Sequence, residues 1–141
     1  MNSERSSVTN TPTRHRHCAR IATAAEWLFD ARSESSPTGL VQTAIAFEAL
    51  YGGAKGESVV ETLANRIAYT LGRTPQHREW LVESFTDFYD TRSKVVHNGA
   101  SRLTNEQKVQ LGSTQRVLKE LLRHELRLVA EGATSSPQVP T

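Results

Sequence analysis

Residues 58–72 read SVVETLANRIAYTLG, and this stretch predicts one complete amphipathic helix. Ser58 and Glu61 stand three positions apart, which is the spacing of a capping box that satisfies free backbone N–H groups in a first turn. Gly72 stands where a helix end favours glycine. Between these signals, apolar residues recur at the spacing of a buried helix face: Val59, Val60, Leu63, Ala64, Ile67, Ala68 and Leu71. The stretch therefore predicts a helical protein whose core includes this segment.

The same spacing signals extend outward to four further helices. They are expected at about residues 19–32, 37–51, 75–98 and 105–131. Ser36, Thr74 and Thr104 stand where N-terminal caps are expected, and Gly99 and Gly132 stand where helices should stop. No strand pattern, internal repeat or glycine-rich phosphate loop is present. Because the connections are short, we predict an all-α fold, an antiparallel bundle of four to five helices.

Length and composition indicate a single domain. The chain has 141 residues, of which 37% are hydrophobic, enough to bury a core. Residues 1–18 and 132–141 are polar and lack an apolar period, so both are expected to be disordered tails. The helical domain is therefore predicted to span residues 19–131.

Charge, cysteine content and the absence of long apolar runs limit which partners and cofactors the chain is expected to bind. The formal charge is +2, with an isoelectric point near 8.9, so any contact with nucleic acid must be local. Cys18 is the single cysteine and forms no internal disulfide. The nearby His15 and His17 do not complete a closed zinc set, and no metal or other cofactor is predicted. No apolar run could cross a membrane or act as a signal core, so a cytoplasmic protein without a membrane partner is expected.

The candidate functional residues lie in residues 92–97, which read RSKVVH. Arg92 occupies a position between Phe88 and Val95 where the helix period calls for an apolar residue. A buried arginine needs a carboxylate, a cleft or a partner chain. Glu48, at the edge of the apolar face of residues 37–51, could supply that carboxylate, and Arg66 is the other possible partner of Glu48. His97 follows roughly 140° further around the helix.

Arginine and histidine together provide a fixed positive charge and a group that exchanges protons near neutral pH, which suits chemistry on a phosphodiester. A purely structural interpretation stays open. In that interpretation Arg92 forms an ion pair inside the bundle, and His97 interacts with the dipole at the helix C-terminus.

Three segments carry a resemblance to a known family. Residues 44–52 read AIAFEALYG, residues 63–68 read LANRIA, and residues 88–99 read FYDTRSKVVHNG. Over roughly residues 38–129 the chain resembles a HEPN domain, specifically the ApeA-like branch found in bacterial defence proteins. The mark of that family is an arginine, a polar residue, three further residues and a histidine. Arg92, Ser93 and His97 match it.

The resemblance implies an all-α bundle and, as in many members, metal-independent ribonuclease activity. We expect the 2′-hydroxyl of RNA to attack the adjacent phosphorus, with His97 as acid or base and Arg92 as the phosphate clamp. Supporting roles are expected for a further set of residues: Ser93 to orient, Glu48 to hold Arg92, Asn98 in the Asn-Gly turn, and Lys94 and Arg102 to contact RNA. A two-fold homodimer would bring two such histidines together.

Regulation and the alternative function follow from the same motif. An antitoxin or a sensor protein is a candidate partner. Some toxin members carry a tyrosine two residues after the histidine, and Gly99 stands there in this chain, so control through that tyrosine is not expected. The alternative is a non-catalytic module that binds RNA or a nucleotide, or that dimerises within a larger defence complex.

Overall fold

The computed structural model describes residues 10–32, 35–52 and 58–134, and this part of the chain is built from helices. In order, they are α2 (Asn10–Arg32), α3 (Pro37–Tyr51), α4 (Val59–Leu71), α5 (Pro75–His97) and α6 (Asn105–Thr134). These ranges contain no strand, which confirms the predicted all-α fold class. None of these helices is both long and apolar enough to span a membrane.

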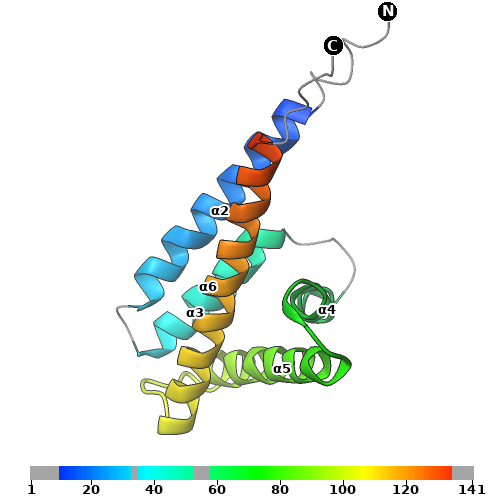
Figure 1. Ribbon diagram of the computed structural model, residues 1–141. Helices are drawn as coiled ribbons and strands as arrows, with labels where there is room; N and C mark the ends of the chain where they lie inside the picture. The colour runs from blue at the N-terminus through cyan, green and yellow to red at the C-terminus, as the bar shows by residue number, and fades with distance from the viewer. Residues whose placement is uncertain (1–9, 33–34, 53–57, 135–141) are drawn as a thin grey trace, which may run out of the picture.

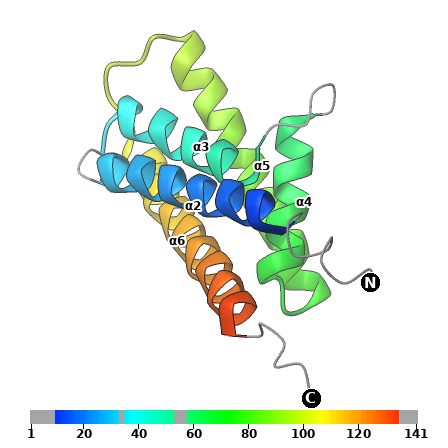
Figure 2. The same ribbon diagram turned by 90° about the horizontal axis from the view of Figure 1, so that it is seen from above.

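The helices form two antiparallel hairpins that cross steeply, with α6 packed on both. The first hairpin is α2 and α3 and the second is α4 and α5, and α6 contacts all four of these helices (Figures 1 and 2). In Figure 1, α4 is seen end-on while α3 runs obliquely across the view. The expected antiparallel packing of successive helices therefore holds inside each hairpin and is wrong between α3 and α4. The steep crossing lets α6 bury its apolar face against both hairpins.

Polar caps begin the helices at the positions that the sequence predicts. Thr104 and Gln107 form a reciprocal capping box at α6, with N–H···O distances of 2.8 and 3.2 Å. The side-chain oxygens of Ser36, Ser58 and Thr74 each accept a hydrogen bond from a backbone N–H of the turn that follows. These local contacts explain why the starts of α3 to α6 were predictable.

The two ends of the helical region differ from the prediction. Residues 10–18 were expected to be a disordered tail, but they form the first turns of α2. Their helix is held by tertiary contacts, because the Arg14 guanidinium donates to the carbonyl of Val129 on α6. The α6 helix continues through Gly132 to Thr134, since one glycine costs only about 1 kcal/mol in a helix. Residues 1–9 and 135–141, the rest of the predicted tails, lie outside the described part of the chain.

The core lies where the two hairpins and α6 meet. Phe47 of α3 and Phe88 of α5 are fully buried, and the rings of Phe47 and Phe85 are 4.9 Å apart at an edge-on angle. Leu63 and Ile67 of α4 are also fully buried, which confirms the face read from residues 58–72. This aromatic centre fixes how α3 and α5 face each other, and so it positions the polar residues at their flank.

Candidate functional site

Arg92 lies on the face of α5 that carries the buried residues, as its spacing predicts. Its side chain is half-buried. Its Nε is buried and has no hydrogen-bond partner within the described residues. The guanidinium carbon is 5.8 Å from the centre of the Tyr89 ring, a distance at which a cation is attracted to the ring face. A buried donor without an acceptor costs about 1–3 kcal/mol, so this arginine is suited to receive an acceptor from outside the chain.

Glu48 interacts with Tyr89 instead of with an arginine. The Tyr89 hydroxyl donates a short hydrogen bond to Oε1 of Glu48. The expected direct pairing of Glu48 with Arg92 or Arg66 is therefore wrong, because the phenol of Tyr89 takes that place. Burial, and then the neighbouring carboxylate of Glu48, raise the pKa of Tyr89, so its hydroxyl stays neutral. Tyr89 was not among the residues predicted for the site, although it precedes Arg92 by about one helical turn.

His97 is the last residue of α5 and is exposed. The turn after it forms as predicted: the backbone N–H of Asn98 bonds to the Lys94 carbonyl at 2.9 Å, and Gly99 has a positive φ of 58°. Within the described residues, His97 makes no hydrogen bond or ion pair that would orient its ring. One chain therefore carries Arg92 and His97 at the same end of α5 but on different sides of the helix.

The remaining predicted residues lie around this end of α5. Ser93 is half-buried and lies next to Arg92 in the chain. Lys94 pairs with Asp90 at 2.9 Å, and both side chains are exposed, so this pair contributes little to stability. Arg102 is exposed in the connection to α6. Of the predicted set, Glu48 and Arg92 converge on Tyr89, and the others form a looser polar surface.

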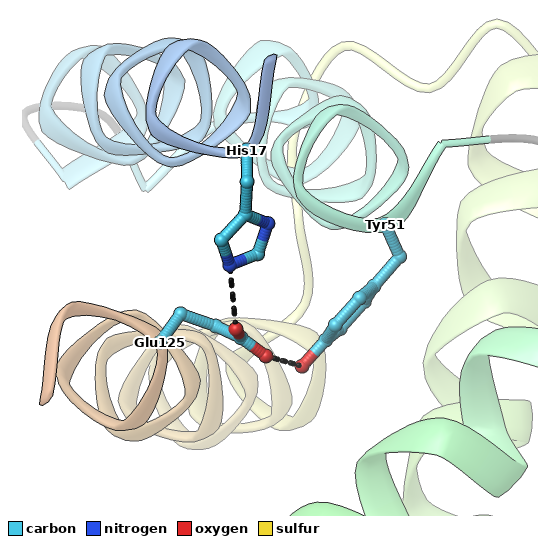
Figure 3. A network of polar contacts seen from close by, with 3 residues as sticks. All are labelled: His17, Tyr51 and Glu125. Atoms are coloured by element: carbon cyan, nitrogen blue, oxygen red, sulfur yellow. Dashed lines mark hydrogen bonds and ion pairs between the residues drawn. The ribbon is translucent and has the colours of Figure 1, made fainter. Parts of the chain in front are cut away.

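A second polar cluster joins α2, α3 and α6 (Figure 3). Glu125 of α6 is only 8% exposed, and two side chains contact its carboxylate. Nε2 of His17 is 2.9 Å from one oxygen, and the Tyr51 hydroxyl donates to the other at 3.5 Å. A carboxylate at this depth requires such partners. The cluster therefore ties the beginning of α2 to α6.

Helix α4 also contributes a side chain to this second cluster. The guanidinium carbon of its Arg66 is 4.9 Å from the centre of the Tyr51 ring. Burial, and then the charge of Glu125, raise the pKa of Tyr51, against smaller opposing effects of Thr70 and Arg66. The spacing of His17 before Ile21 and of Glu125 after Leu121 places both on apolar faces, so the count that singled out Arg92 would also have found them.

The two clusters have the same arrangement of arginine, tyrosine and glutamate, but they differ in whether a buried polar group lacks a partner. In each, an arginine lies over a tyrosine ring, and the tyrosine hydroxyl bonds to a glutamate. The first cluster leaves a buried arginine donor without an acceptor, whereas the second contains a histidine held by a carboxylate. No group of three or more potential metal ligands occurs within the described residues.

Comparisons with protein-family models, with curated proteins and with solved structures returned no match.

Proposed function

We propose that this chain is a metal-independent endoribonuclease of a prokaryotic defence or toxin system, acting as a homodimer through Arg92 and His97. The observation that supports this most is the buried Nε of Arg92, which lacks an acceptor within the described residues. A phosphate oxygen is a suitable acceptor, because the planar guanidinium offers paired donors that match phosphate geometry.

The proposed reaction needs a base, an acid and positive charge. One His97 imidazole takes the proton of the 2′-hydroxyl, and the 2′-oxygen then bonds to the adjacent phosphorus. The bond from phosphorus to the 5′-oxygen breaks, and the His97 imidazolium of the partner chain gives that oxygen its proton. Arg92 stabilises the charge on the non-bridging oxygens. The products are a 2′,3′-cyclic phosphate and a 5′-hydroxyl.

A dimer supports this scheme because one chain supplies only one histidine at this end of α5. A two-fold interface places the same surface of each chain opposite itself, which brings two His97 and two Arg92 side chains to one site. Val96, which precedes His97, is 50% exposed. An apolar residue at this place suits an interface that covers it.

A non-catalytic module that binds RNA or a nucleotide, or that only dimerises, is the second candidate. The observation in its favour is that His97 has no oriented partner within the described residues, whereas binding needs only the cations Arg92, Lys94 and Arg102. Such a module would retain RNA without cutting it.

The deciding experiment uses the purified protein, an end-labelled RNA and excess chelator. We expect cleavage that leaves 2′,3′-cyclic phosphate ends and that is lost in His97→Ala. His15→Ala is the matched control, because His15 is exposed on α2 and far from this motif in the chain. Retention of RNA without cleavage would instead support the binding module.

A further inference from the structure

We propose that the outward face of α2 binds a second copy of this chain, with the two α2 helices running antiparallel. This face is formed by Cys18, Ala22, Ala25 and Phe29, which we call the outer stripe. The outer stripe lies on a different helix from Arg92 and His97, so this interface is independent of the ribonuclease proposal.

The outer stripe has the spacing of a coiled-coil seam. Its residues recur at steps of four, three and four positions, which keeps them along one line of a helix that pairs with another helix. The inner side of α2 carries a separate apolar set, which is buried: Ile21, Ala24, Leu28 and Ala31. A helix with apolar residues on two sides needs cover on both. Within the described residues, the packing of the chain covers only the inner side.

The outer stripe is open to solvent at the edge of the molecule that α2 forms (Figure 1). Phe29 is 79% exposed, and the three other residues of the stripe are exposed as well. A shallow hollow beside Phe29 is lined by Ala25, Glu26, Phe29 and Asp30. Single exposed apolar side chains are ordinary on a protein surface, but several in one line along a helix suit a partner helix.

The outer stripe is complementary to itself when a second α2 runs in the opposite direction. Its spacing reads the same from either end, so a reversed copy places Cys18 opposite Phe29 and Ala22 opposite Ala25. The alanines at the centre let the two helices approach closely, and the small Cys18 leaves room for the Phe29 ring of the other chain. Each contact then occurs twice, as a two-fold interface requires.

The charges on α2 favour the same antiparallel arrangement. Arg16 and Arg20 precede the middle of the outer stripe, Glu26 and Asp30 follow it, and Arg32 lies beyond its last residue. An antiparallel pair places the basic half of each helix beside the acidic half of the other, whereas a parallel pair would place like charges together. A second copy therefore matches the stripe in both shape and charge, which is why we assign it as the occupant.

The first test is sedimentation of the full chain over a range of concentrations. We expect the parent to reach about twice the mass of the Phe29→Ser variant or more, because a two-fold contact doubles whatever assembly forms without it. Phe29 is exposed, so the variant should keep the helix content of the parent by circular dichroism. Tyr69→Ser is the matched control, because Tyr69 is an 88% exposed aromatic residue of α4, and it should sediment like the parent.

A second test determines the direction of the two helices. Chains with Ala22→Cys and chains with Ala25→Cys, both in a Cys18→Ser background, are mixed and mildly oxidised. The antiparallel register predicts disulfides between the two kinds of chain, because a disulfide needs Cα atoms within about 7 Å and this register places residue 22 opposite residue 25. A parallel pair would instead join chains of the same kind.

Three results would overturn the proposal. The first is a Phe29→Ser variant that sediments like the parent, which would mean that a second copy does not cover the outer stripe. The second is a Tyr69→Ser variant that loses association to the same extent as Phe29→Ser. The third is a set of disulfides that join chains of the same kind as readily as chains of different kinds.

Discussion

At the scale of single residues, two buried tyrosines stand between a glutamate and an arginine. Tyr89 bonds to Glu48 and lies under Arg92, and Tyr51 bonds to Glu125 and lies under Arg66. Each hydroxyl donates a hydrogen bond to a carboxylate, which for Glu125 adds to the contact with His17, and each ring face attracts a guanidinium. Two testable consequences follow from keeping these phenols neutral and in place.

The first consequence is a loss of stability at alkaline pH. Burial and a neighbouring carboxylate raise the pKa of both Tyr51 and Tyr89 above the value near 10 of an unfolded tyrosine. The unfolded chain therefore releases these protons first, and the free energy of unfolding should fall above pH 10 by about 1.4 kcal/mol per pH unit for each tyrosine. Below pH 10 their contribution is fully present. Urea denaturation between pH 8 and 11 measures the slope. An equal slope in the Tyr51→Phe, Tyr89→Phe double variant would contradict this explanation.

The second consequence concerns how Arg92 is positioned. Tyr89→Phe keeps the ring under the guanidinium and removes only the hydroxyl that bonds Glu48, whereas Tyr89→Leu removes both. We expect kcat/KM for RNA cleavage to fall more in Tyr89→Leu than in Tyr89→Phe, with both variants folded by circular dichroism. Equal activity in the two variants would show that the ring does not position Arg92.

At the scale of helices, features that depend on neighbouring residues could be predicted from the sequence. Features that depend on contacts between distant helices could not. Ser36, Ser58 and Thr74 cap the helices that they precede, because a cap depends only on the next few residues. The predicted start of α2, at about residue 19, was wrong because the first turns of this helix are stabilised by contacts with α6. The crossing of the hairpins depends on which faces meet, and a single sequence does not show this.

Helix α4 provides a direct test of core packing. Leu63 and Ile67 are fully buried, so Leu63→Ala or Ile67→Ala should lower the free energy of unfolding by about 2–5 kcal/mol through lost burial and a cavity. Tyr69→Ala is the control on the same helix, since Tyr69 is 88% exposed, and it should change stability by less than about 0.5 kcal/mol. Chemical denaturation measures all three. Parent-like stability of both core variants would remove α4 from the core.

The start of α2 provides a test of the second cluster. His17→Ala leaves the buried carboxylate of Glu125 with Tyr51 alone, which should cost about 1–3 kcal/mol. Hydrogen exchange of the amides of residues 10–18 should become faster, while exchange in α5 stays the same. Arg16→Ala, at an exposed position of the same turn, is the control. Unchanged exchange in His17→Ala would mean that packing elsewhere holds these turns.

At the scale of the whole molecule, the candidate site was only partly visible in the sequence. Counting along α5 placed Arg92 on the inner face, because helix period and burial are linked. The same count could not show that Tyr89 would reach Glu48 first, since that depends on the distance between α3 and α5. It also could not show that His17 and Glu125 meet, because they are 108 positions apart in the chain. Contacts between distant helices require the fold.

The central claim is that two copies of the chain build one catalytic site that requires both His97 side chains. It is tested most directly by mixing parent and His97→Ala chains in equal amounts, allowing subunits to exchange, and measuring RNA cleavage in chelator. Random pairing leaves about one quarter of the dimers with two intact chains, so the account predicts about one quarter of the parent activity. About three quarters would mean that one His97 is enough for the shared site, about one half would mean that each chain acts as an independent site, and undiminished activity would mean that His97 has no part in cleavage; each of these results would contradict the account.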